Sequence, residues 1–243
     1  MLESLLDLWW SSPDVVYSDE YVVRSQTDGY CRVMPRKSLG AMTDDIIERE
    51  IVYHRHLGRS FEWTQTGFGD ENEILSRLES HGFVIGTKEV ICLIDLEAFD
   101  LSERSEIRVE RVQDEQGLAD FRAVAEEVFE KDFAYTTGVL RECLASGSRK
   151  QIGFVGYDGD YAVSIGRLDT QGDSLIGGLY TGGTRKEYRG RGFYRAVVGR
   201  RAEYARELGL RYLSVDARPT SLPILRRLGF EEVVESWPCE WNP

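Results

Sequence analysis

The sequence predicts an α/β (α+β) fold with a mixed, mostly antiparallel central sheet flanked by helices. Residues 107–112 alternate apolar and polar side chains, which is the pattern of a half-buried strand. Asp158-Gly159 joins two further strand-like runs and is typical of a hairpin turn. Between Tyr194 and Leu208 the apolar residues recur at helical spacings, which predicts a helix with one buried face.

The second half of the chain supplies the elements in order. After the first strand, the periodicity predicts helices around 118–129 and 137–144. Three strands, a loop, a helix, a strand, a short helix and a last strand then follow, at 151–156, 161–168, 174–181, 185–192, 194–208, 211–215, 221–228 and 232–237. Gly209 and Gly229 are expected to end the two helices.

The first half repeats part of this order. Residues 46–96 and residues 193–241 each contain a helix ending in Leu-Gly, a strand, a short helix ending in Gly-Phe and a closing strand. Four elements in the same order favour a shared supersecondary unit. The polar stretch 101–106 separates the two halves, so we expect one region at 1–105 and a second at 106–243.

The composition indicates a globular protein. The 243-residue chain is 42% hydrophobic and has no run of about 18 uncharged apolar residues that could span a membrane. Acidic residues near its start do not suit a signal peptide, so we expect a cytoplasmic protein. Four widely spaced cysteines and three histidines give neither a disulfide framework nor a metal-ligand pattern, and no metal is expected.

Charge is distributed unevenly along the chain. The net charge is −12, yet residues 185–227 hold 12 basic side chains against four acidic ones. A basic stretch in an acidic protein favours a small anionic ligand over nucleic acid, because the negative surface repels a long polyanion. A solvated helix face would give the same local composition.

Residues 185–194 carry the clearest chemical signal. They read Arg-Lys-Glu-Tyr-Arg-Gly-Arg-Gly-Phe-Tyr and lie between a predicted strand and the amphipathic helix. The first amides of a helix have no partner inside it, and glycines let an anion approach the backbone. The neighbouring arginines add further donors, so the loop suits a pyrophosphate or a similar anion.

Other motifs fit less well. A dinucleotide fingerprint needs a third glycine where Arg195 stands, and the Gly-Lys-Ser/Thr of a Walker loop does not occur. Ser164 lacks the first glycine of a nucleophile elbow and lies within a predicted strand.

The loop and the order of elements over residues 106–243 resemble the GNAT acetyltransferase superfamily. Its acyl-CoA loop reads Arg/Gln-x-x-Gly-x-Gly/Ala between the fourth strand and the third helix. Arg189 and Gly192 match the first and fourth positions, and residues 228–230 match the family's closing Leu-Gly-Phe. The chain looks like bacterial two-part members whose first half, here 1–105, is a degenerate GNAT-like region.

This resemblance implies acetyl-CoA as the acyl donor, with no metal. The loop amides would hold the CoA pyrophosphate, and the end of the preceding strand would pair with the pantetheine. The residues so implied are Gly182, Gly183, Thr184, Arg189, Gly190, Arg191, Gly192, Phe193 and Tyr194.

Three positions depart from the family's pattern. Tyr194 replaces a small residue at the sixth loop position, so its ring must turn aside for the backbone to reach a phosphate. Leu225 stands where many members have a tyrosine that protonates the leaving thiolate, and residues 176–180 lack the glutamate that some members use as a base. By residue type, Tyr180 and Asp216 are candidates for proton transfer. The sequence favours other roles for both, namely packing or a pantetheine contact for Tyr180, and a loop cap or pairing with a nearby arginine for Asp216.

Two functions from different classes follow from these observations. The first is an N-acetyltransferase in which a primary amine attacks the acetyl thioester directly. Its acceptor would be a small-molecule amine or a protein amino group, and the acidic first half favours a cationic one. The second is a non-catalytic acyl-CoA-binding or scaffolding module, which the missing tyrosine and glutamate favour. A homodimer is compatible with both functions, whereas nucleic-acid and membrane partners are not expected.

Overall fold

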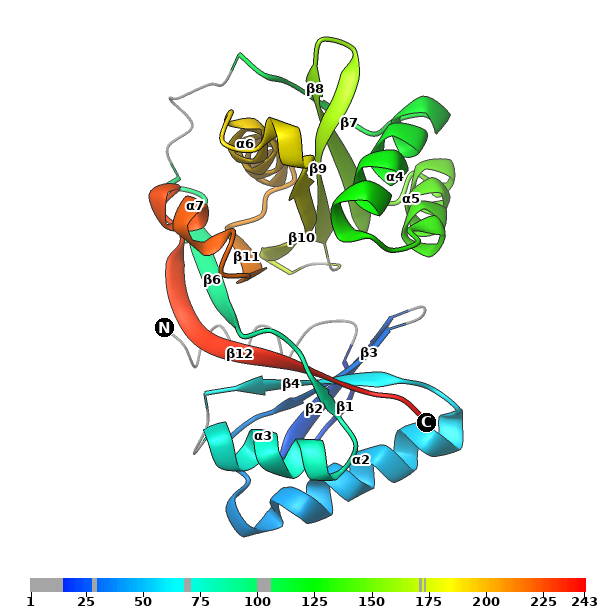
Figure 1. Ribbon diagram of the computed structural model, residues 1–243, viewed down its shortest axis with the longest axis vertical. Helices are drawn as coiled ribbons and strands as arrows, with labels where there is room; N and C mark the ends of the chain where they lie inside the picture. The colour runs from blue at the N-terminus through cyan, green and yellow to red at the C-terminus, as the bar shows by residue number, and fades with distance from the viewer. Residues whose placement is uncertain (1–14, 28–29, 68–70, 100–105, 171, 173) are drawn as a thin grey trace. The chain divides into compact units, whose positions relative to one another are not determined.

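The computed structural model divides into two compact units, each of which is described by itself (Figure 1). The first unit comprises Met1–Cys92, Asp216–Pro223 and Glu232–Pro243, and the second comprises Leu93–Val215 and Ile224–Glu231. The structure describes residues 15–27, 30–67, 71–99, 106–170, 172 and 174–243. The expected division at 101–106 falls almost entirely on residues outside these ranges.

The first unit is built on a mixed sheet. Its elements are β1 (Val15–Ser18), β2 (Val22–Thr27), β3 (Tyr30–Pro35), η1 (Gly40–Met42), α2 (Thr43–Leu57), β4 (Phe61–Thr66), α3 (Glu71–Ser80), β5 (Val84–Ile85), most of β6 (Glu89–Asp95) and nearly all of β12 (Glu231–Trp241). β1, β2 and β3 pair antiparallel, and β3 pairs in parallel with β4 across the connection through α2. β12 pairs antiparallel with both β4 and β5.

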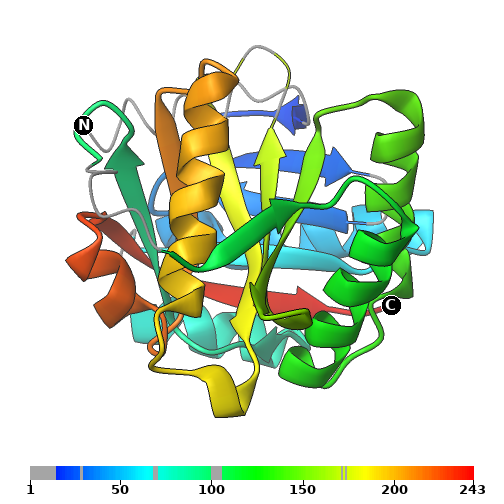
Figure 2. The same cartoon turned by 90° about the horizontal axis from the view of Figure 1, so that it is seen from above.

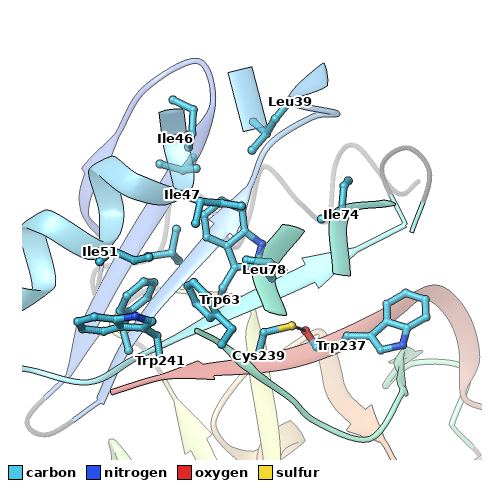
Figure 3. Packing of buried hydrophobic residues seen from close by; sticks show 14 of the residues in the cluster. Leu39, Ile46, Ile47, Ile51, Trp63, Ile74, Leu78, Trp237, Cys239 and Trp241 are labelled. Atoms are coloured by element: carbon cyan, nitrogen blue, oxygen red, sulfur yellow. Dashed lines mark hydrogen bonds between the residues drawn. The ribbon is translucent and has the colours of Figure 1, made fainter. Parts of the chain in front are cut away.

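The core of the first unit lies where α2 and α3 cover this sheet (Figure 3). Ile47 of α2, Leu78 of α3 and Trp63 of β4 are all fully buried. β12 adds Trp237, Cys239 and Trp241 to the same cluster. The last strand of the chain is therefore part of the interior of the first unit.

The second unit holds the loop identified from the sequence. Its elements are β7 (Arg108–Arg111), α4 (Glu115–Phe129), α5 (Ala134–Ser146), β8 (Gln151–Asp158), β9 (Tyr161–Thr170), β10 (Ile176–Thr184), η2 (Lys186–Tyr188), α6 (Phe193–Glu207), most of β11 (Tyr212–Ala217) and most of α7 (Leu222–Arg227). β7, β8, β9 and β10 pair antiparallel in turn, whereas β10 and β11 pair in parallel. The predicted mixed, mostly antiparallel sheet flanked by helices is confirmed.

Helices cover both faces of this second sheet. Figure 1 shows α6 on one face of β8, β9 and β10, with α4 and α5 on the other. Glycines bring the layers close together. A Cβ at Gly156 would lie 3.2 Å from Val197 of α6, and a Cβ at Gly153 would lie 3.3 Å from Leu140 of α5 and 3.4 Å from Phe121 of α4.

The compact units do not follow a single cut of the chain. β12 closes the second repeat but pairs in the first unit. Residues 93–95, which end the first repeat, belong to the second unit, where the N–H of Leu96 donates to the carbonyl of Arg211 at 2.8 Å. Local periodicity locates strands but does not identify their distant partners.

None of the helices that the structure describes has the length and apolar character that crossing a bilayer requires.

Candidate functional site

The loop between β10 and α6 presents backbone groups to solvent. Gly190 and Gly192 adopt left-handed φ angles of +75° and +89°, and Gly192 is the N-cap of α6. Figure 2 shows the yellow segment that leads into this helix. A Cβ at Gly190 would meet no atom within 4 Å. The first hydrogen bond of α6 runs from the N–H of Ala196 to the carbonyl of Gly192, so the first-turn amides have no acceptor within the helix. The loop therefore has the geometry of an anion site at a helix N-terminus.

The arginines of the loop have different surroundings. Nε of Arg189 donates to the carbonyl of Thr184 at 3.1 Å and ties the loop to the end of β10. Arg191 is half exposed, pairs with Asp158 at 2.9 Å and lies over the ring of Tyr188. Arg191 can thus turn toward a bound anion by giving up a surface ion pair, which contributes little to stability.

Arg185 anchors the start of the loop instead of serving a ligand. Its buried side chain donates from Nε to the carbonyl of Ala162 at 2.9 Å and forms an ion pair with Glu127. Ser164 is also buried, and its hydroxyl donates to the carbonyl of Gly183 at 3.0 Å. Ser164 is thus a strand residue that supports β10, as the sequence analysis favoured.

β10 contains a bulge that the sequence analysis did not identify. Tyr180 pairs with Arg167 and Gly183 pairs with Ile165, so β10 carries one more residue than β9 between these two points. Thr181 lies in this bulge with a φ of +49°, which is unusual for a β-branched residue. The parallel register with β11 covers Ile176 to Gly178 and ends there. Beyond Gly178, one edge of β10 is therefore left without β11 pairing in the described register.

Tyr194 turns away from the backbone of the loop. A Cβ at Gly182 would lie 3.0 Å from a ring carbon of Tyr194, so the ring covers Gly182 on the α6 side of β10. Its hydroxyl interacts with the guanidinium of Arg201. Tyr194 therefore leaves the loop amides accessible, which is the condition that the sequence analysis set for anion binding.

Tyr180 lies on the opposite face of β10. Its ring folds back over Gly178, where a Cβ would overlap it. Arg167, its partner in register on β9, lies 5.5 Å from the ring centroid. Arg167 pairs with Asp169 through two hydrogen bonds of 2.6 and 2.9 Å, and Gln151 donates to the same carboxylate. The sequence analysis missed Arg167 and Asp169, because only the pairing with β9 places them beside Tyr180.

Asp216 belongs to the first unit. It lies at the end of β11 and pairs with Arg32 at 3.5 Å. Burial raises the pKa of Asp216, and the negative charge of Glu62 adds to this rise against the opposing charge of Arg32. Burial and the charge of Asp216 likewise raise the pKa of Glu89. The pairing of Asp216 with an arginine was the alternative explanation that the sequence left open.

Leu225 of α7 is fully buried, so no phenol stands at that place. Among the described residues there is no group of three or more His, Cys, Asp and Glu side chains that could hold a metal ion.

Solved structures share this architecture. A functionally unknown conserved protein from Staphylococcus epidermidis aligns with 98% of this chain and 97% of its own, at a TM-score of 0.68 and 14% identity. A GCN5-related N-acetyltransferase from Kribbella flavida aligns with 99% of this chain and 93% of its own, at a TM-score of 0.66 and 15% identity. The protein has a GNAT fold.

A tandem GNAT protein from the clavulanic acid biosynthesis pathway also aligns with 99% of this chain and 87% of its own, at a TM-score of 0.54 and 13% identity. No protein-family model and no curated protein matches the sequence. At these identities the likeness establishes the GNAT fold, within which β10, the loop and α6 stand in the order that the resemblance predicted.

Proposed function

We propose that this protein is an N-acetyltransferase that transfers the acetyl group of acetyl-CoA to a primary amine. One observation carries the proposal. Within the second unit, the end of the register between β10 and β11, the bulge of β10 and the glycine-arginine loop at the start of α6 follow one another along the chain. This sequence of features suits an extended thioester ligand with an anionic end.

The residues present fit an acyl-CoA. The amides of Gly190, Arg191, Gly192, Phe193 and Tyr194 would hold the pyrophosphate. The amide of Arg189 donates to the carbonyl of Lys186 at 3.3 Å, so Arg189 would contribute through its side chain. Left-handed Gly190 and Gly192 leave room for phosphate oxygens against the backbone. Gly182, Gly183 and Thr184 follow the bulge on the strand that would pair with the pantetheine.

Acetyl-CoA would supply an activated thioester, and the bulge of β10 would orient it. An amide that donates to the thioester carbonyl stabilises the negative charge that develops there during attack. The new C–N bond forms as the C–S bond breaks, and the amine nitrogen loses a proton. A group on this chain, or water, must accept that proton, because a protonated amine is not nucleophilic.

The acceptor side of the site would be the face of β9 and β10 that carries Tyr180. Tyr180 remains a candidate for proton transfer on this face. Asp216, the other candidate by residue type, belongs to the first unit, where Arg32 pairs with it. The structure adds Asp169, since residues paired directly across two strands share a face and Asp169 pairs with Gly178. The carboxylate of Asp169 already pairs with Arg167, so the expected cationic acceptor would have to compete with that guanidinium for it.

A non-catalytic acyl-CoA-binding module is the second candidate. The buried Leu225 favours it, because it supplies no acid for the leaving thiolate. Both candidates predict CoA binding, and only the first predicts amine-dependent release of free thiol.

Turnover with a panel of amines separates the two functions. Purified protein would be incubated with acetyl-CoA and, in turn, polyamines, aminoglycosides, amino acids and a lysine-containing peptide. Thiol release above the acceptor-free rate, with a matching acetylated product by mass spectrometry, supports the transferase. Binding of acetyl-CoA without release for any acceptor supports the binding module.

A further inference from the structure

We propose that Arg201 of α6 is a positioning residue for the acyl site, because its guanidinium hydrogen-bonds to β9 and β10 beside the bulge, on the face of the sheet that α6 covers. This inference rests on the proposed acetyl-CoA site and assigns a role to a residue outside the loop. Arg201 is 1% exposed and is one of the largest fully buried side chains in the described part of the protein.

The guanidinium of Arg201 bonds to both strands at the start of the bulge. Its Nη1 donates to the carbonyl of Arg167 at 3.1 Å and to the carbonyl of Tyr180 at 3.4 Å. Arg167 and Tyr180 are the last pair in register before the bulge. A single nitrogen therefore bridges β9 and β10 at the point where their register shifts.

The other contacts of Arg201 fix its own position. Nε donates to the carbonyl of Val197 one turn earlier in α6, at 3.3 Å. The side chain also hydrogen-bonds to Tyr194, which covers Gly182 just after the bulge residue Thr181. Arg201 thus contacts the strand directly before the bulge and, through Tyr194, contacts it at Gly182, before the pairing with β9 resumes at Gly183.

The surrounding sequence leaves room for this side chain. A Cβ at Gly166 of β9 would lie 2.5 Å from Cζ of Arg201, so any larger residue would displace the guanidinium. A Cβ at Gly182 would lie 3.6 Å from its Nη2. Two glycines on neighbouring strands therefore line the space that the guanidinium occupies.

Burial of the charged guanidinium of Arg201 carries a desolvation cost. Burial lowers the pKa of Arg201 to about 10, although Tyr194 and Asp169 oppose the shift. The described hydrogen bonds of the guanidinium go to backbone carbonyls and Tyr194, not to a carboxylate. An apolar side chain would fill the same space without the desolvation cost. The observed geometry instead gives the bulge a rigid charged support, which would keep its amides aligned on a thioester carbonyl.

The test compares how variants bind CoA and how they polarise the acetyl carbonyl. Isothermal calorimetry measures the affinity for CoA. Difference infrared spectroscopy measures the carbonyl stretch of bound [1-¹³C]acetyl-CoA, which shifts to lower frequency when an amide donates to it. Neither measurement needs an acceptor. The variants are Arg201→Met, which removes all donors, and Arg201→Lys, which keeps the charge with fewer donors.

Arg200→Met is the matched control. Arg200 precedes Arg201 on α6 but pairs at the surface with Glu203 and Glu207. We expect this control to show the wild-type carbonyl shift. We expect Arg201→Met to bind CoA within about threefold of wild type, with less than half of the carbonyl shift, and Arg201→Lys to restore part of it.

Each outcome decides the proposal. A full carbonyl shift in folded Arg201→Met or Arg201→Lys would overturn the role of Arg201 and leave the proposed function standing. Absence of acetyl-CoA binding by the wild-type protein would overturn both. If Arg201→Met does not fold, the same comparison is made on Arg201→Lys and on Tyr194→Phe, which loses one partner of Arg201 and keeps the ring.

Discussion

His54 shows how burial sets the charge of a single side chain. It lies in α2, is 2% exposed and stacks on Phe61 with ring centroids 4.0 Å apart. Its Nδ1 lies 2.9 Å from the carbonyl of Glu50. Burial lowers the pKa of His54, and the hydrogen bond to Glu50 opposes this shift only in part. The folded first unit therefore holds His54 in its neutral form.

This lowered pKa predicts acid sensitivity. Because the unfolded chain binds the proton more tightly, stability from His54 is full above the unfolded value of about 6.5 and is lost as the pH falls. We expect the melting temperature of His54→Phe, which keeps the ring stack, to fall less than that of wild type when the pH is lowered from 7.5 to 5. His56→Phe, at an exposed position of the same helix, serves as the control. Equal losses in wild type and His54→Phe would contradict this explanation.

The residues of the loop illustrate what a sequence alone discloses. The place of Gly190 and Gly192 in a loop between a strand and a helix, together with the family resemblance, predicts that they bind an anion, and both glycines have a left-handed φ in the structure. The bulge at Thr181 could not be predicted, because it arises from pairing with β9 and not from the residue type. Arg201 counted only as one of 12 basic residues, and its burial depends on glycines on two other strands.

At the scale of elements, the packing of the helices against the sheet of the second unit is so close that some glycine positions have no room for a side chain. A Cβ at Gly153 of β8 would lie 2.9 Å from Val112 and 3.3 Å from Leu140. A Cβ at Gly138 within α5 would meet no atom within 4 Å. The two glycines belong to neighbouring elements but have opposite requirements for space.

This contrast predicts that replacing each glycine by alanine changes the free energy of unfolding in opposite directions. We expect Gly153→Ala to lower the free energy of unfolding by about 1–3 kcal/mol, because the added methyl overpacks the layer between β8 and the helices. We expect Gly138→Ala to raise it by about 0.5–1 kcal/mol, because alanine favours a helix interior. Urea unfolding of the full chain measures both. A stabilising Gly153→Ala would show that the layers are looser than these distances imply.

At the scale of the whole molecule, the strand that closes the second repeat, β12, belongs to the first unit, whereas β6, which closes the first repeat, is divided between the two units. The order helix, strand, helix, strand was predicted for both halves and is present as α2, β4, α3, β6 and as α6, β11, α7, β12. The partner of β12 could not be predicted, because six paired positions with β4 join residues at least 170 apart in the chain. Backbone pairing over such a distance leaves no local pattern.

The place of β12 in the first unit predicts how a shortened chain behaves. We expect a fragment of residues 1–105 to remain unfolded, because it lacks the strand that supplies Trp237, Cys239 and Trp241 to the core of the first unit. Circular dichroism and thermal melting of the fragment beside the full chain would show this. A cooperative melting transition in the fragment would mean that β12 is dispensable.

The central claim is that the loop at the start of α6 binds the pyrophosphate of acetyl-CoA, and calorimetric titration of the full chain tests it most directly. Gly192→Glu places bulk and negative charge in the loop. Gly209→Glu is the control, since Gly209 also has a left-handed φ, of +82°, but follows the other end of α6. A Cβ would meet no atom within 4 Å at Gly209 and would make an ordinary contact of 3.5 Å with Ile107 at Gly192.

We expect wild type and Gly209→Glu to bind acetyl-CoA with micromolar affinity, about −8 kcal/mol, and Gly192→Glu to bind at least about 100-fold more weakly. Undetectable binding by wild type, or equal binding by both glutamate variants, would contradict the assignment of the loop.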